Sequence, residues 1–412
     1  MKLEIDAARL SAEIEALALI SEAEPPVVTR IVFTPADMRA RAWMIERCRD
    51  AGLSIRQDPI GNMFARWQGS DAGGPVVGTG SHIDAIPNAG KYDGVVGVLG
   101  GLEAIRALQR SGFRPKNSIE LLIFTSEEPT RFGIGCLGSR LLAGTLSLDA
   151  AAKLRDKNGE AVEDVRREAG FGGEIRDVKL PRGYCKAFVE LHIEQGPLLE
   201  RDSVPLGVVT KIAAPASARV AIEGVGGHAG GVLMPDRHDA LCAASELILA
   251  IENAAQTSGS ADTVATVGIC DVFPGAVNSI PSRVRISVDA RDTDLARRDN
   301  VMRALDLAAK EVAERRGVSV QIELLNADAP ADCAPEVVGA LCAACRKQGE
   351  KFLPMVSRAY HDSLFMSHIA PTAMLFIPCR NGYSHRPDEY ASIEDIARGT
   401  MVLAEALASL SS

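Results

Sequence analysis

Histidine and acidic side chains gather at five points along the chain, each at the end of an apolar run or within a glycine-rich stretch. The segments are GSHIDAIPNAGKYDG with His82, Asp84 and Asp93, FTSEEPTRFG with Glu127 and Glu128, ELHIEQGP with His192, GGHAG with His228, and GYSHRPDE with His385. Imidazole nitrogens and carboxylate oxygens are common ligands of divalent cations. These residue types therefore predict a metal centre with carboxylates close by for proton transfer.

The adjacent pair Glu127 and Glu128 is the most informative of these segments. It directly follows the apolar run IELLIF, which is typical of a buried strand. Neighbouring carboxylates there point to opposite sides and are costly unless a metal ion or hydrogen bonds compensate. Any one of the histidines or carboxylates could be a structural or solvated residue. Together they favour a shared metal site.

Alternating helices and strands must position these residues in the first half of the chain. Helical patterns such as GVLGGLEAIRALQRSG alternate with strand patterns such as PVVGTGSHID and SIELLIFTSEE. This alternation predicts an α/β fold with a mixed, mostly parallel sheet and helices on both faces. Such sheets bind ligands outside the carboxyl ends of their strands, where His82, Glu127 and His192 are expected.

The pattern changes at about Ala214. Strand, helix, strand, strand, helix and strand patterns then follow one another up to VSVQIELLN. This βαββαβ order is typical of an α+β ferredoxin-like unit. The polar stretch NADAPADCAP leads back to helix and strand patterns that resemble the first half. We therefore expect a catalytic domain formed by residues 1–213 and 327–412, with residues 214–326 inserted as a second domain.

Composition argues against several classes of partner. A net charge of −9 offers no basic footprint for nucleic acid or an anionic membrane. We find no signal peptide and no apolar run that approaches a membrane span. Nine scattered cysteines favour reduced thiols, so the expected location is the cytoplasm. Cys342 and Cys345 form a CxxC in a helical pattern, where packed small residues are favoured over a redox or zinc site.

The five segments, together with NSIP and DARD, resemble the M20-type metallohydrolases in order and over essentially the whole chain. The nearest resemblance is to their hydantoinase/carbamoylase branch. It implies two divalent metal ions, most simply Mn, although Zn, Co or Ni would suit the same ligands. The implied ligands are His82, Asp93 and His192 for one ion and Asp93, Glu128 and His385 for the other. Glu127 would be the general base, and Asp84 would orient His82.

The same resemblance implies roles for the inserted domain. It would act as a lid and join two chains in a homodimer, and His228 would reach the partner subunit's active site to stabilise the developing oxyanion. Asn278 of NSIP and Arg291 of DARD would bind a substrate carboxylate, for which an arginine fork is well suited. Gln195 and His361 are further expected substrate contacts.

Substrate choice depends on the segment SRAYHDSLFM. Carbamoylases and allantoate enzymes generally read GHD there, whereas this chain has Tyr360 in place of the glycine, and it is similar to ureidoglycolate amidohydrolases. A bulky phenol would shrink the pocket and suit a two-carbon acid, although Tyr360 could also be a core residue. The expected reaction is hydrolysis of (S)-ureidoglycolate to glyoxylate, ammonia and CO2. The alternatives are allantoate amidohydrolase, N-carbamoyl-L-amino-acid hydrolase and a non-catalytic binding homologue.

Overall fold

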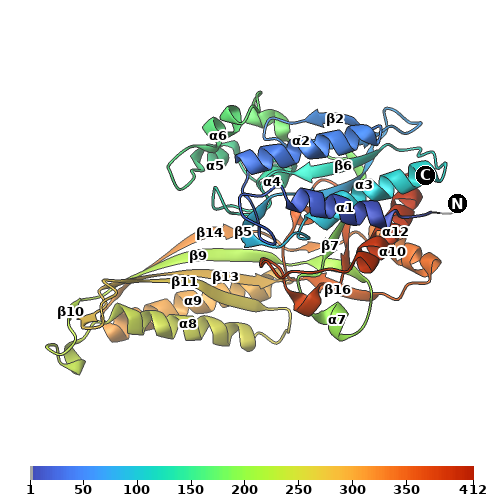
Figure 1. Ribbon diagram of the computed structural model, residues 1–412. Helices are drawn as coiled ribbons and strands as arrows, with labels where there is room; N and C mark the ends of the chain where they lie inside the picture. The colour runs from blue at the N-terminus through green and yellow to red at the C-terminus, as the bar shows by residue number, and fades with distance from the viewer. Residues whose placement is uncertain (1–2) are drawn as a thin grey trace. The chain divides into compact units, whose positions relative to one another are not determined.

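The computed structural model describes residues 3–412 and divides into two compact units (Figure 1). The first unit contains Met1–Thr210, Cys333–Met355 and His361–Ser412, and the second contains Lys211–Asp332 and Val356–Tyr360. The second unit thus extends a few residues beyond the expected insertion at both ends and includes the segment that ends at Tyr360. No helix among residues 3–412 is long and apolar enough to cross a membrane.

A nine-stranded mixed sheet lies mainly in the first unit, although its edge strand β15 belongs to the second. Its order is β15-β8-β17-β7-β4-β6-β3-β2, with β16 paired to β8. The four central strands β17, β7, β4 and β6 run parallel, whereas β8, β3 and β2 are antiparallel to their neighbours. The strands are β2 (Ser54–Gln57), β3 (Met63–Trp67), β4 (Val76–His82), β6 (Ile119–Phe124), β7 (Cys185–Ile193), β8 (Gly207–Ile212), β15 (Ala331–Asp332), β16 (Leu353–Ser357) and β17 (Thr372–Ile377).

Helices cover both faces of this sheet, which confirms the predicted α/β class. Leu121 and Leu122 of β6 point to opposite faces because successive strand residues alternate. Leu121 lies against Gly101 of α3 (Val95–Arg110), whereas Leu122 joins an apolar cluster with Leu137 of α4 (Leu137–Ala143). The other helices of this unit are α1 (Ala7–Ala18), α2 (Pro35–Asp50), α5 (Leu148–Lys153), α6 (Val162–Glu168), α7 (Leu198–Arg201), α10 (Pro335–Gln348), α11 (Asp362–Met366) and α12 (Ile393–Leu410), and a small sheet pairs β1 (Val28–Arg30) with β5 (Ala85–Ala89).

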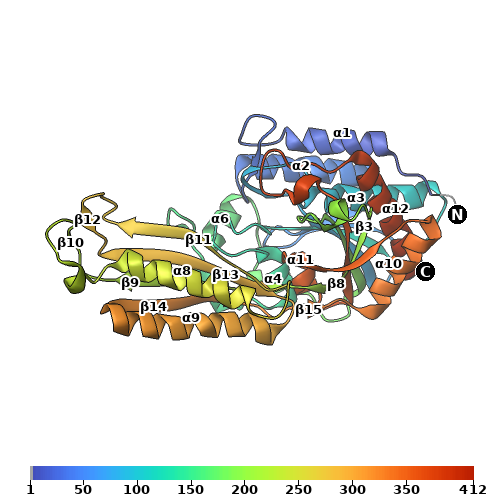
Figure 2. The same cartoon turned by 90° about the horizontal axis from the view of Figure 1, so that it is seen from below.

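The second unit is a four-stranded antiparallel sheet with two helices (Figure 2). Its elements follow the βαββαβ order: β9 (Ala214–Glu223), α8 (Ala240–Gln256), β11 (Val264–Phe273), β13 (Arg283–Asp292), α9 (Leu295–Arg316) and β14 (Ser319–Ala327). Alternate residues of β13, including Val284 and Ile286, are buried against α8 and α9. The short strands β10 (Gly227–His228) and β12 (Ser279–Ile280) pair with each other.

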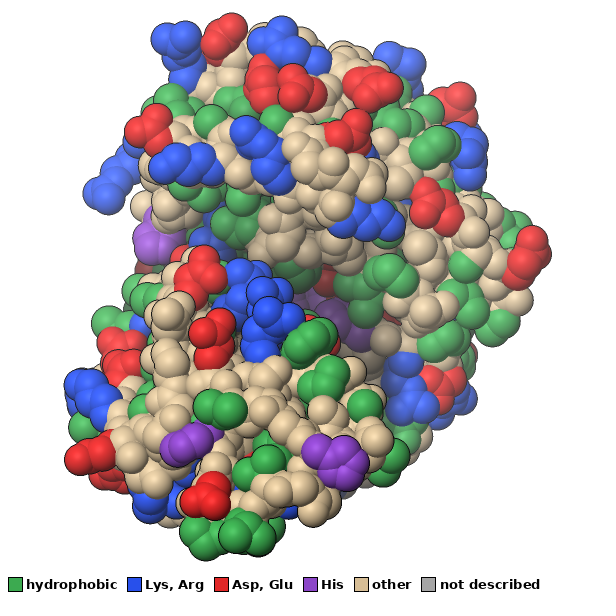
Figure 3. Space-filling model, turned by 90° about the vertical axis from the view of Figure 1, so that its left-hand side faces the viewer, with side chains coloured by type: hydrophobic (Ala, Val, Ile, Leu, Met, Phe, Trp, Pro, Cys, Tyr) green, Lys and Arg blue, Asp and Glu red, His purple; other side chains and the backbone are tan. Residues whose placement is uncertain are grey.

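Two further expectations concern charge and cysteines. Basic and acidic side chains are interspersed on the face drawn in Figure 3. All nine cysteines are free thiols. Cys345 is buried on α10 and Cys342 is half-buried, and neither belongs to a metal-ligating group among residues 3–412.

Candidate metal centre

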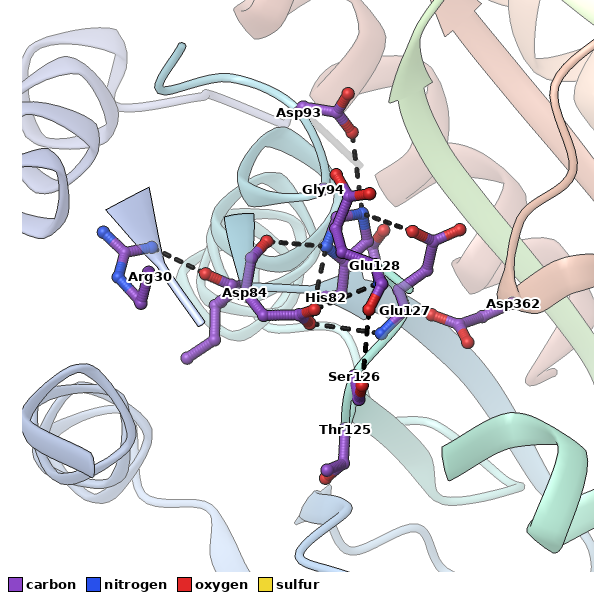
Figure 4. Close-up of polar contacts among 12 residues, drawn as sticks. Arg30, His82, Asp84, Asp93, Gly94, Thr125, Ser126, Glu127, Glu128 and Asp362 are labelled. Atoms are coloured by element: carbon purple, nitrogen blue, oxygen red, sulfur yellow. Dashed lines mark hydrogen bonds and ion pairs between the residues drawn. The ribbon is translucent and has the colours of Figure 1, made fainter. Parts of the chain in front are cut away.

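The ends of neighbouring parallel strands bring the predicted ligands together. His82 is the last residue of β4, Glu127 and Glu128 follow β6, and His192 is the penultimate residue of β7. Asp93 precedes α3 in the glycine-containing loop. Figure 4 shows the carboxylates of Asp93, Glu127 and Glu128 around the His82 ring. Adjacent parallel strands present their carboxyl ends at one edge of the sheet, so segments far apart in the sequence meet there.

His82, Asp93 and His192 form the first group. Asp93 Oδ1 lies 3.5 Å from His82 Nε2 and 3.2 Å from His192 Nε2. The backbone N–H of Gly94 donates to His192 Nε2 at 3.1 Å. Only glycine fits here, because Gly94 has a φ of 67° and a Cβ would lie 2.5 Å from His82 Nε2.

Asp93, Glu128 and His385 form the second group. His385 Nε2 lies 3.3 Å from both Asp93 Oδ2 and Glu128 Oε1. Asp93 is therefore shared, with one carboxylate oxygen turned to each group. The donor atoms of each group all lie within 4.8 Å of one another.

The charge balance of these groups fits a pair of divalent cations. Burial opposes ionisation of Asp93, yet hydrogen bonds from His192, His385 and His82 hold its pKa well below the usual range. Burial and the neighbouring Asp93 raise the pKa of Glu128 to about 7, against the effect of His385. Buried carboxylates at such short range repel one another unless positive charge is placed between them. Imidazoles and carboxylates converging on a shared Asp are the donor set expected for two such ions.

Backbone carbonyl oxygens face the Nδ1 atoms of two of the predicted ligands, His82 and His192. His82 Nδ1 lies 3.0 Å from the backbone oxygen of Asp84, and His192 Nδ1 lies 2.9 Å from that of Ile193. An Nδ1–H that donates to such a carbonyl turns Nε2 of the same ring towards the two groups, where His82 Nε2 faces Asp93 and His192 Nε2 accepts from the Gly94 N–H. The Asp84 carboxylate is farther from His82, at 3.7 Å, and instead accepts from the backbone N–H groups of Glu127 and Glu128 at 3.2 and 3.1 Å.

Glu127 is placed to hold and release a proton beside this centre. Its side chain is buried, and its Oε2 lies 3.7 Å from His82 Nε2. The Cys136 thiol donates to Oε1 at 3.4 Å. Burial raises the pKa of Glu127 well above its usual range, the charges of Glu128 and Asp362 add to this, and His82 opposes it. Oε2 is thus the oxygen that faces the ligand groups.

Gln195 and His361 also lie next to the ligands. Gln195 Nε2 donates to Asp93 Oδ2 at 2.6 Å. The buried His361 ring packs 4.5 Å from the His192 ring. His361 can be grouped with His192 and Glu190 as a third set of potential ligands. Glu190, however, already accepts hydrogen bonds from Ser81 and Ser363, which occupy both of its oxygens.

The remaining predicted residues belong to the second unit. The Arg291 guanidinium stacks on the Tyr360 ring, 5.4 Å from its centroid, and donates to Asp289. His228 is exposed and pairs with Ser279, beside the exposed Asn278. Arg291 and Tyr360 thus lie at one end of β13, and His228 and Asn278 lie beyond its other end. At about 3.3 Å of rise per residue, this ten-residue strand separates them by roughly 30 Å.

Sequence reasoning did not identify Ser384 and Glu389 as part of the centre. Ser384 Oγ lies 2.5 Å from Asp93 Oδ2 and 2.9 Å from Glu389 Oε2. Both residues flank His385 in GYSHRPDE, so the motif contained them, but a serine and a glutamate in a polar loop are ordinarily solvated.

Known proteins resemble this chain over nearly its full length. The Peptidase family M20/M25/M40 matches residues 78–409. A ureidoglycolate hydrolase of Oryza sativa subsp. japonica is 51% identical over 99% of this chain and 85% of its own length. One of Arabidopsis thaliana is 50% identical over 99% of this chain and 87% of its own length. The crystal structure of AtUAH in complex with glyoxylate superposes with a TM-score of 0.93 at 49% identity, covering 99% of this chain and 98% of that one. The chain therefore belongs to the peptidase family M20/M25/M40.

Proposed function

We propose that this protein hydrolyses (S)-ureidoglycolate at its ureido carbonyl. The observation that supports this most strongly is the similarity to two ureidoglycolate hydrolases, which are 51% and 50% identical over 99% of this chain. Hydrolysis of the ureido group releases ammonia and carbon dioxide and leaves 2-hydroxyglycine, which loses a second ammonia to give glyoxylate. The glyoxylate bound in the similar crystal structure supports this product.

The residues of the metal centre would hold two divalent ions, for which we propose Mn. His82, Asp93 and His192 would bind one ion, and Asp93, Glu128 and His385 the other. When bound, such a pair polarises the carbonyl and makes water a stronger acid, which an unreactive ureide requires. Gln195, which donates to Asp93, would keep the shared carboxylate oriented or turn its amide towards the substrate. His361 would support the His192 ring.

Glu127 would transfer the proton. The Cys136 thiol occupies Oε1, so Oε2 is the oxygen available to accept a proton from the attacking water. The same oxygen would then deliver the proton to the leaving nitrogen. A carboxylate whose pKa is raised by burial holds a proton more firmly between these two steps.

Two residues of the second unit would bind the substrate carboxylate. Arg291 presents its guanidinium beside the Tyr360 phenol, which suits the carboxylate of a two-carbon acid. Asp289 orients this guanidinium from the same strand. The separation of roughly 30 Å along β13 means that Arg291 and His228 of one chain cannot touch one small substrate. We therefore propose a homodimer, joined through the second units, in which His228 and Asn278 serve the partner's site.

The proposed location of the chain is the cytoplasm, which its nine free thiols support. The decisive assay incubates Mn-reconstituted protein separately with ureidoglycolate, allantoate and N-carbamoyl-L-amino acids and measures ammonia. We expect the highest kcat/KM on ureidoglycolate. A higher value on either of the other substrates would replace the proposal with that activity, and no turnover of any would favour a non-catalytic role.

A further inference from the structure

Glu389 is a buried carboxylate whose contacts all converge on the metal centre. It is 4% exposed. Its Oε1 accepts the backbone N–H groups of Tyr92 at 2.8 Å and Asp93 at 3.1 Å. Its Oε2 accepts from Ser384 Oγ at 2.9 Å. None of the roles assigned above uses this residue.

These contacts join the two segments that carry Asp93 and His385. On one side, Oε1 holds the main chain at Asp93 itself. On the other, Ser384 immediately precedes His385, and its hydroxyl also reaches Asp93 Oδ2 at 2.5 Å. The two segments lie almost 300 residues apart in sequence, since Asp93 and Glu389 are separated by 296 residues. One side chain thus sets the position of a shared ligand relative to a second ligand.

The surroundings of Glu389 leave it little freedom. A Cβ at Gly90 would lie 2.4 Å from Glu389 Cβ, so the loop before Asp93 packs directly on this side chain. The Glu389 backbone N–H donates to the Arg386 carbonyl at 3.1 Å, which closes the loop after His385. A buried carboxylate that served only to fill space would be disfavoured against an apolar residue of similar size.

We propose that Glu389 is a positioning residue that holds Asp93 and His385 at the spacing needed for the ion they share with Glu128. This inference rests on the proposed pair of metal ions. Outer residues that orient ligands typically change metal affinity by about 10- to 100-fold when replaced. The ion held by Asp93, Glu128 and His385 should be affected most, because Glu389 acts on two of its three ligands.

The test compares Glu389→Gln with Glu394→Gln, an exposed glutamate in the first turn of α12. Glutamine matches the shape of glutamate but has only one acceptor oxygen, so it can no longer accept from Ser384 while it accepts from the two backbone amides. Metal-free proteins are titrated with Mn2+ by calorimetry, and the EPR spectrum of the loaded proteins reports whether two Mn ions are magnetically coupled. Unfolding temperatures of the metal-free proteins show whether the fold is retained.

For E389Q we expect an affinity for the second Mn2+ about 10- to 100-fold weaker, loss of the coupled-pair EPR signal at two equivalents of Mn2+ per subunit, and recovery of kcat in excess Mn2+. E394Q should behave as wild type. Ser384→Ala removes the hydroxyl contacts to Glu389 and Asp93 but keeps the hydrogen bonds between Glu389 and the backbone amides. It should also weaken binding of the second ion, and it replaces E389Q in the test if E389Q does not fold.

Two results would overturn the proposal. One is an unchanged second-ion affinity with an intact coupled-pair signal in both E389Q and S384A. The other is an equal loss of affinity for both ions together with a lower unfolding temperature of the metal-free protein. That result would assign Glu389 a general structural role. Wild-type protein that binds fewer than two Mn2+ would reject the metal pair itself, and the inference with it.

Discussion

At the scale of single residues, this site is built from carboxylates given different tasks by their surroundings. Burial would raise the pKa of Asp93, but hydrogen bonds from three imidazoles hold that pKa well below its usual range. Glu127 keeps a raised pKa because burial and two neighbouring carboxylates outweigh the effect of His82. Asp84 accepts hydrogen bonds from the backbone N–H groups of Glu127 and Glu128, and so fixes the position of this backbone segment. Pairs of carboxylates whose pKa values are driven apart are typical of acid–base sites.

The first prediction concerns Glu127→Gln. Glutamine has nearly the same size but cannot carry the proton, so turnover should fall by about 10²–10⁴-fold or more. Metal content, measured by elemental analysis, should remain at the wild-type value. Near-normal ammonia release from the metal-loaded variant would remove Glu127 from the mechanism.

A second prediction tests Tyr360. If its phenol closes the pocket around a two-carbon acid, Tyr360→Gly should lower kcat/KM for ureidoglycolate by about ten- to two-hundred-fold relative to longer ureides. Tyr360→Phe keeps the ring over Arg291. It should therefore show only the part of the loss in kcat/KM that is due to the hydroxyl. Equal losses on every substrate would instead mark Tyr360 as structural.

At the scale of elements, helix α3 explains how the sheet carries a site at its edge. Its first turn follows Asp93, and its glycines allow it to lie close to the central strands. A Cβ at Gly97 would lie 2.4 Å from the Leu191 carbonyl oxygen of β7, one residue before His192. Close packing here links the positions of Asp93 and His192.

The third prediction follows from this packing. Gly97→Ala should destabilise the protein by about 1–3 kcal/mol, because backbone cannot move aside cheaply. Gly339→Ala is the matched control, since Gly339 lies inside α10 with nothing within 4 Å of its Cβ position. That change should stabilise by about 0.5–1 kcal/mol. Denaturant unfolding measures the free energy of unfolding of both variants. Equal changes in this free energy at the two positions would contradict the close packing of α3 on β7.

At the scale of the whole molecule, the second unit separates residues with proposed roles at the two ends of β13. Arg291 lies near the end of β13, while Asn278 and His228 lie near its start. The ten-residue strand β13 separates these groups by roughly 30 Å. In the proposed function, their joint action on one substrate would therefore need two chains.

The fourth prediction is complementation between inactive variants. His228→Ala and Arg291→Ala should each be inactive, but a random mixture of subunits should recover about a quarter of wild-type activity, because half of the dimers hold one intact site. Native mass spectrometry verifies that heterodimers form. Verified heterodimers without activity would place both residues on the same site of one chain.

The sequence by itself determined which residue types stand at the strand ends and how the elements alternate. His82, Glu127 and His192 could be placed at one sheet edge because strand ends and apolar periodicity are local properties. Tertiary structure alone decided which distant groups touch. The contact between Glu389 and Asp93 depends on two loops meeting beside the sheet edge, and the Asp84 carboxylate turned to backbone amides rather than to His82. Such pairings depend on backbone positions set by packing of the whole unit, which spacing along the chain does not encode.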